Sequence, residues 1–286
     1  MISLRAAFPS EVRGRPARDQ AARLLRYAVV APSLGLGLAS CGAASAPRPM
    51  DTVQQEASVI HPCFDGEAAA RLDPVTLEYV TSPAGSQHIE YRNAIEVGGP
   101  RLAARVRADM APVLAGTDGP RLSIVQELTF SLPTLAAQSA RMTTVSDDHG
   151  EHVAWDVVVD GGRVRGQAMA PPDGHTIPVD AALEDAVLLP AGARALLPFF
   201  RLDRCANVTL RSLHPRGGPY DVRLEVGERR VVEVPAGRFE AIEVVVGDYS
   251  EPLTYLVRAV PPHFILRYEI PGVGGVVELA GITPAR

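Results

Sequence analysis

Lysine is absent from this 286-residue chain, and all 28 of its Lys and Arg positions are arginine. Because alanine, valine, glycine and proline are abundant as well, we interpret the missing lysine as the imprint of a GC-rich genome and not as arginine-based recognition. The formal net charge is −5; residues 1–40 carry six Arg against two acidic residues, which leaves −9 for the remainder. An acidic surface of this kind argues against binding to nucleic acid and to anionic lipid headgroups.

The common catalytic and cofactor motifs are also missing. The chain has no G-x-S-x-G elbow, no H-E-x-x-H, no P-loop, and no G-x-G-x-x-G between a strand and a helix. The densest polar cluster, Asp147–His152, falls in and beside one predicted turn without a zinc or calcium ligand spacing, so we interpret it as solvated. The other histidines are scattered singly and are predicted surface residues. We therefore predict no catalytic residue, no metal and no cofactor.

The first apolar run of the chain is short. It extends over Tyr27–Ser40, follows Arg23 and Arg26, and contains one proline and two glycines. A membrane-spanning helix needs about 20 apolar residues, so a transmembrane anchor is the weaker interpretation. A basic region, an apolar region and a cleavage site with small residues together indicate a secretory signal peptide.

The end of this run carries a more specific motif. The sequence Leu38-Ala-Ser-Cys41 resembles the lipobox of bacterial lipoproteins, in which the cysteine after the cleavage site receives the lipid. The resemblance implies that residues 1–40 are removed and that Cys41 becomes an acylated N-terminus held in a membrane. The residue after Cys41 is Gly42 and not aspartate. In lipoproteins, the absence of aspartate at this position favours the outer membrane. The expected location is the cell envelope, on the periplasmic face.

Cysteine is scarce, with three residues in the whole chain. If Cys41 is lipidated, Cys63 and Cys205 remain, and neither belongs to a C-x-x-C pair that would favour metal binding. The bacterial periplasm is oxidising, so we predict one disulfide between them. Closing so long a loop would stabilise the fold by roughly 4–5 kcal/mol on the chain-entropy model.

The chain after Cys41 divides into two parts. Residues 41–62 are small, contain proline and have no periodicity, which is typical of a flexible tether. Residues 63–286 fit one domain, in which thirteen period-2 runs rich in Val, Ile, Tyr and Thr alternate with turn residues. We predict a mainly all-β fold: a single antiparallel sheet that is curled or half-barrel-like, with one short helical insertion.

The insertion is expected at Asp180–Phe200, the most apolar part of the chain after the signal. Its first half, Ala181–Leu189, could form a short helix capped by Asp180, and Pro190 would end that helix. Five large side chains of the segment either belong to the core or contact an apolar ligand, and the sequence leaves both open: Leu189, Leu196, Leu197, Phe199 and Phe200.

The C-terminal third carries a hairpin motif, V-P-A-G-x-F-x-A, within Val232–Val244. With the strands Tyr255–Arg258, Ile265–Glu269 and Val276–Leu279, it resembles a family of exported bacterial proteins known only as a domain of unknown function. The resemblance implies a β-rich fold broadly similar to the half-barrel of periplasmic lipoprotein carriers. It carries over no activity, because none is established for the family. The motif itself is typical of a tight turn, since proline fixes φ and glycine tolerates positive φ.

These observations lead to two functional expectations. The first is a non-enzymatic, lipid-anchored envelope protein that binds or carries an apolar small molecule or lipid, or scaffolds envelope components. The alternative is an envelope hydrolase or carbohydrate-active protein, with carboxylates that the sequence does not identify. An apolar concave face would favour the first, and a polar cleft with two carboxylates within about 10 Å of each other would favour the second.

Overall fold

The structure is a computed structural model. It describes residues 61–82, 86–96, 99–110, 122–146, 150–169, 174–183, 187–247, 252–270 and 275–284. The predicted signal peptide, Cys41 and the tether up to residue 60 lie outside the described residues. None of the helices within the described ranges is long and apolar enough to cross a membrane.

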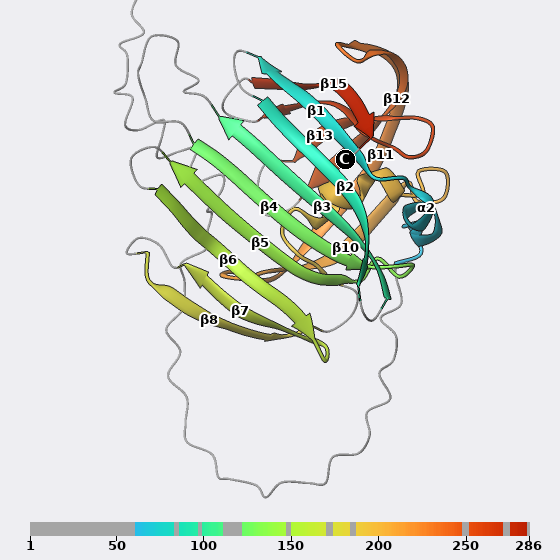
Figure 1. Cartoon of the computed structure of the whole chain (residues 1–286). Helices are drawn as coiled ribbons and strands as arrows, with labels where there is room; N and C mark the ends of the chain where they lie inside the picture. Colours follow the sequence, from blue (N-terminus) through green and yellow to red (C-terminus); the bar gives the residue numbers. More distant parts are fainter. Residues whose placement is uncertain are drawn as a thin grey trace, which may run out of the picture. The chain divides into compact units, whose positions relative to one another are not determined.

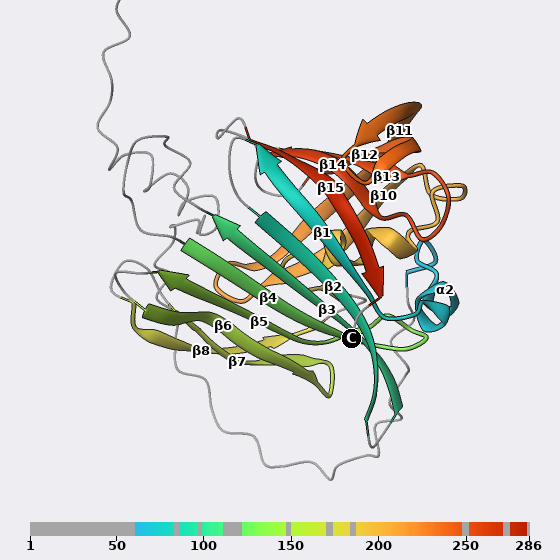
Figure 2. The ribbon, with the colours of Figure 1, turned by 45° about the horizontal axis from the view of Figure 1, so that its top comes forward.

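Fifteen strands of the described residues form one hydrogen-bonded sheet, and Figures 1 and 2 show the N-terminal strands lying side by side. The strands are β1 (Val75–Ser82), β2 (Ser86–Glu96), β3 (Gly99–Met110), β4 (Leu122–Ser131), β5 (Ala137–Ser146), β6 (Gly150–Asp160), β7 (Arg163–Met169), β8 (Thr176–Ala182), β9 (Val187–Leu188), β10 (Asn207–His214), β11 (Gly218–Val234), β12 (Gly237–Gly247), β13 (Leu253–Arg258), β14 (Ile265–Ile270) and β15 (Gly275–Pro284). Their order runs from β8 back to β1, then from β15 back to β9. The first and last strands of the chain therefore pair in the middle of the sheet, and β8 and β9 are its edges.

The pairing is antiparallel except for the two-residue β9, which runs parallel to β10. Side chains alternate between the two faces, as β1 illustrates: Val75, Leu77 and Tyr79 are buried while the residues between them are not. Arginine–carboxylate pairs cross between neighbouring strands on the solvated face. Examples are Arg141–Asp156, Arg211–Asp221 and Arg230–Glu243. Each such exposed pair contributes about 0–1 kcal/mol, so burial of the inner face stabilises the sheet more than these charges do.

The predicted fold class is confirmed, but the strand list changes. The thirteen period-2 runs do not include β3, β8 and β9. Two of the period-2 runs, 220–226 and 229–234, are predicted as separate strands, but they form one strand, β11, with a register shift between Val226 and Arg229. The reason is a β-bulge, which adds residues to one strand without ending its pairing. The Gly99-Pro100 pair predicts a loop, but β3 begins at Gly99. Proline is tolerated at the start of a strand.

The predicted helix over Ala181–Leu189 is wrong. Ala181 and Ala182 continue β8, which pairs with β7. Asp180 does not cap a helix, because its carboxylate accepts a hydrogen bond of 2.7 Å from Nε of Arg163 on the neighbouring strand. The helical insertion comes later, as α3 (Gly192–Leu196) and the 3-10 helix η1 (Leu197–Phe199).

A second helix, α2 (Gly66–Arg71), was not predicted. It follows the first described residues and is capped at its start by Asp65, whose carboxylate accepts a hydrogen bond of 2.9 Å from the Ala68 amide. An Asp at this position satisfies an amide that the helix leaves without a partner. The helix is only six residues long, so contacts with the rest of the chain must hold it in place.

The V-P-A-G motif forms the turn between β11 and β12. Val234 pairs with Gly237, and Gly237 has a φ of 133°, which a residue with a Cβ rarely adopts. The Ala236 amide at the tip donates a hydrogen bond of 2.9 Å to the Leu279 carbonyl of β15. The motif therefore shapes the turn and fastens the hairpin to a strand that is not its neighbour in the sheet.

Candidate functional site

The five side chains proposed as ligand contacts lie in one segment, Leu189–Leu202, which we call the inner segment. It contains α3 and η1 and joins edge strand β9 to the chain before β10. Leu189, Leu196, Leu197, Phe199 and Phe200 are each only 1–2% exposed. The sequence prediction left core packing and ligand contact open for these residues, and their burial places them in the interior of the fold.

The helix of this segment, α3, begins directly after a residue in the left-handed conformation. Ala191 has a φ of 62°, in the left-handed region, and the Gly192 amide donates a hydrogen bond of 2.7 Å to the Leu189 carbonyl. The chain thus turns sharply after Pro190 before α3 begins. Pro198 falls in the first turn of η1, where no amide hydrogen bond is required.

Three backbone hydrogen bonds fasten the end of the inner segment to two other parts of the chain. The Pro198 carbonyl accepts a bond of 2.9 Å from the His263 amide, in the loop between β13 and β14. The Phe199 carbonyl accepts a bond of 2.7 Å from the Asp65 amide, and the Arg201 amide donates a bond of 2.7 Å to the Cys63 carbonyl. The segment is held by isolated bonds and packing, in contrast to the continuous ladders of the sheet.

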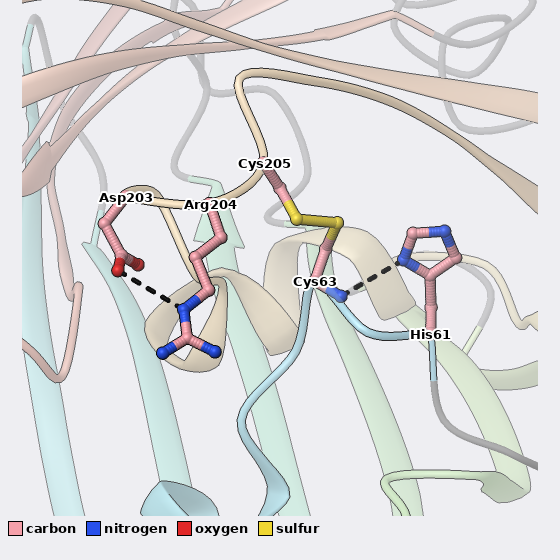
Figure 3. Close-up of a disulfide and its surroundings, with 5 residues drawn as sticks. All are labelled: His61, Cys63, Asp203, Arg204 and Cys205. Atoms are coloured by element: carbon pink, nitrogen blue, oxygen red, sulfur yellow. Dashed lines mark hydrogen bonds and ion pairs between the residues drawn. A yellow bond between two sulfur atoms is a disulfide. The ribbon is translucent and has the colours of Figure 1, made fainter.

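A disulfide joins the start of the described residues to the chain just after the inner segment, as Figure 3 shows. Cys63 and Cys205 are 142 residues apart in sequence, and their Cα atoms are 5.7 Å apart. The disulfide predicted from the sequence is therefore present. Nearby, Nδ1 of His61 accepts a hydrogen bond of 3.3 Å from the Cys63 amide, and partial burial lowers the pKa of this histidine.

Aromatic packing reinforces the covalent link. Phe64 and Phe200 meet edge to face, with ring centroids 5.5 Å apart, and their backbones form an isolated β-bridge. Both rings are almost fully buried. Such a pair contributes about 0.5–1.5 kcal/mol beyond the area it buries. The chain just after the tether and the inner segment are thus packed together as one unit.

Arg194 is the single charged residue in the sequence of α3. Its Nη1 donates a hydrogen bond of 3.4 Å to the Tyr268 hydroxyl, and its guanidinium lies 5.8 Å from the centre of the same ring. Tyr255 lies beside Tyr268, with ring centroids 5.2 Å apart. The inner segment therefore combines a large apolar surface with the positive charge of Arg194, which contacts Tyr268 of the aromatic pair on β13 and β14.

The described residues offer little for catalysis. They contain no group of three or more His, Cys, Asp or Glu side chains that could hold a metal ion. The hydrogen bond from Arg163 lowers the pKa of Asp180, whereas a general acid in hydrolysis needs a raised pKa. His152 is exposed, and His149 lies outside the described residues. No observation on the described part of the chain favours the hydrolase alternative.

Two histidines that were predicted to lie on the surface are buried. His214 ends β10 and is 8% exposed, and His263 precedes β14 and is 6% exposed. Burial, together with the charge of Arg216, lowers the pKa of His214 to about 4. Burial also lowers the pKa of His263, whose Nδ1 donates a hydrogen bond of 2.8 Å to the Arg258 carbonyl. No sequence pattern predicts the burial of either histidine, because contacts from distant parts of the chain bury them: Trp155 packs against His214, and the Pro198 carbonyl is hydrogen-bonded to the His263 amide.

Comparison with known proteins adds information on the fold alone. No protein-family model and no curated protein matches the sequence. A solved structure of a beta-barrel-like protein of the domain of unknown function DUF1849, from Brucella abortus, is similar with a TM-score of 0.53 at 10% identity. The alignment covers 76% of this chain and 99% of that one. A DUF1089 family protein from Pseudomonas aeruginosa gives a TM-score of 0.34 at 13% identity, over 64% of this chain and 90% of that one. Neither comparison bears on the lipobox or the hairpin motif.

Proposed function

We propose that this chain is a non-enzymatic, lipid-anchored envelope protein whose curled sheet holds an apolar small molecule or lipid against the inner segment. The observation that carries the proposal is the inner segment itself. A connection between two strands does not need five fully buried Leu and Phe side chains, but a cover for an apolar inner face does.

The way the inner segment is fastened supports a role beyond packing. Its end is held by three backbone hydrogen bonds and by a disulfide that follows it, while each sheet strand from β1 to β8 has a ladder of bonds. An element held in this way can shift without breaking the sheet, as a cover over a binding site must. Arg194 beside Tyr268 would suit the polar end of an amphiphile, because a guanidinium binds carboxylate or phosphate strongly.

The proposed location rests on two independent features. Leu38-Ala-Ser-Cys41 matches a lipobox, and the Cys63–Cys205 disulfide is typical of an oxidising compartment. Together they favour export, anchoring through Cys41 and a position on the periplasmic face of the outer membrane. The membrane is then a partner through the lipid and not through a charged surface, since residues 41–286 are acidic.

Replacing Cys41 with alanine tests the anchor. The Cys41→Ala protein has no thiol at the cleavage site, so we expect it to lose fatty-acid labelling completely and to retain its signal peptide. Metabolic labelling with a clickable fatty acid and the mass of the purified protein measure both effects. Ser40→Ala is a matched control, because it keeps a small residue before Cys41 and should be labelled normally. Labelling of the Cys41→Ala protein equal to that of the wild type would refute the anchor.

A bound molecule should be visible in protein extracted from membranes with a mild detergent. We expect a higher mass for the native protein than for the denatured one, because a non-covalent ligand leaves on unfolding whereas the acyl chains on Cys41 stay. Native mass spectrometry followed by organic extraction of the same sample measures the difference and identifies the molecule. Equal native and denatured masses in several detergents would contradict the carrier function and leave the anchor intact.

A further inference from the structure

The turn between β10 and β11 contacts strands near the opposite end of the sheet. β10 lies next to edge strand β9, whereas β7 lies next to edge strand β8 and β6 is the strand after β7. The rings of His214 and Trp155 nevertheless meet edge to face, with centroids 5.4 Å apart and an interplanar angle of 69°. This contact brings the two ends of the strand order together, and the described strands show no backbone pairing between those ends.

Arg216, in the turn between β10 and β11, also contacts β6 and β7, through its charged side chain. Its guanidinium lies 5.8 Å from the centre of the Trp155 ring, within the range of a cation–π interaction. Its Nη1 also donates a hydrogen bond of 3.2 Å to the carbonyl of Met169, the last residue of β7. His214 and Arg216 thus contact β6 and β7 through two side chains, and we call Trp155, Met169, His214 and Arg216 the latch.

The hydrogen bond inside the turn fixes the state of His214. The Arg216 amide donates a bond of 3.1 Å to Nδ1 of His214, so this nitrogen has a lone pair and the ring is neutral with its proton on Nε2. Protonation of Nδ1 would place two N–H groups against each other. It would also add a positive ring next to the Arg216 guanidinium, inside a buried site.

We propose that the latch is acid-sensitive: it holds the two ends of the curled sheet together while His214 is neutral and releases them when the ring is protonated. The inference is independent of whether the protein binds an apolar ligand. Opening would separate the β10–β11 turn from β6 and β7 and expose the inner face at this seam. The sheet itself would remain, because backbone hydrogen bonds and the Cys63–Cys205 disulfide hold it together, and protonation of the His214 ring breaks neither.

The direction of the pH dependence follows from the cause of the pKa shift. Burial, and then the charge of Arg216, lowers the pKa of His214 from 6.5 to about 4 while the latch is closed. Among the described residues, Arg216 is the charge that acts on this ring; Trp155 and the Met169 carbonyl, which complete the latch, do not titrate. An open latch binds the proton more strongly, so acidification favours opening. Between pH 7 and pH 5 the opening equilibrium should rise about 20-fold if the open ring has its ordinary pKa.

The protein contains its own reporter, because Trp155 is the only tryptophan in the chain. We would titrate the purified full chain in detergent micelles from about pH 8 to pH 4.5 and record tryptophan emission, acrylamide quenching and far-ultraviolet circular dichroism. We expect the emission to shift to longer wavelength and quenching to increase, with a midpoint between the two pKa values. Circular dichroism should stay unchanged through the transition.

Two variants and a control decide the outcome. His214→Asn keeps an acceptor for the Arg216 amide without titrating, so the transition should disappear. Arg216→Ala should give the long-wavelength emission already at neutral pH, with unchanged circular dichroism. His263→Asn is the control, since it removes another buried histidine of lowered pKa and should leave the transition intact. The proposal is overturned if His214→Asn retains the transition, if Arg216→Ala emits as the wild type does, or if strand signal is lost together with the shift.

Discussion

Replacing Cys63 and Cys205 together with serine will lower the free energy of unfolding by about 4–5 kcal/mol. The bond closes a loop over a sequence separation of 142 residues, so its removal lets the unfolded chain gain much conformational freedom. Urea denaturation of wild-type and variant protein, followed by circular dichroism, measures the change as a lower midpoint. Treating the wild type with a reductant should reproduce the effect, and the double variant should not respond to the reductant.

The same variant should also loosen a defined region. The Cys63 carbonyl and the Asp65 amide bond directly to the inner segment, so we expect faster hydrogen exchange at residues 63–65 and 199–202. Exchange in the centre of β12, which pairs with strands on both sides, should change little. A loss of stability below about 1 kcal/mol would mean that the packing of Phe64 and the hydrogen bonds of Cys63 and Asp65 hold the segment without the disulfide. The covalent link would then have no role in holding the segment in place.

The parts of the fold that depend on local pattern were predictable. Strand β1 alternates buried and exposed residues, and the V-P-A-G turn specifies its own geometry through Pro235 and Gly237. The disulfide followed from cysteine count and compartment. The helix predicted over Ala181–Leu189 was misplaced because alanine has a high helical propensity. In the structure Ala181 pairs with Val164 of β7 instead, and this pairing depends on residues elsewhere in the chain.

The site was predictable only in part, for a related reason. Apolar density indicated that Leu196 and Phe200 would be important to the interior, but not which elements would surround them. Phe64 comes from the start of the domain and His263 from near its end, and the fold brings both to the inner segment. Likewise, the sequence around His214 predicts a single polar residue before a turn. Only the curl of the sheet places Trp155 against the His214 ring.

Replacing Phe200 with aspartate is expected to unfold the domain, not merely to release a ligand. The ring is 1% exposed and in edge-to-face contact with Phe64, so an aspartate there would bury an unpaired charge and leave a cavity. We expect a loss of more than about 4 kcal/mol for Phe200→Asp and of about 3–5 kcal/mol for Phe200→Ala. Urea denaturation of Phe200→Ala gives the magnitude, and circular dichroism shows whether Phe200→Asp folds.

Val231→Asp is the matched control, because it introduces the same charge on a strand at a side chain that is 58% exposed, and it should cost no more than about 1 kcal/mol. If Phe200→Asp instead folds with near-normal stability and loses a co-purifying molecule, Phe200 contacts the ligand and the inner segment moves aside in the folded protein. If it folds and still binds the molecule, the inner segment is not the cover of the site. Stability and ligand content of the same sample therefore separate a core residue from a binding residue at this one position.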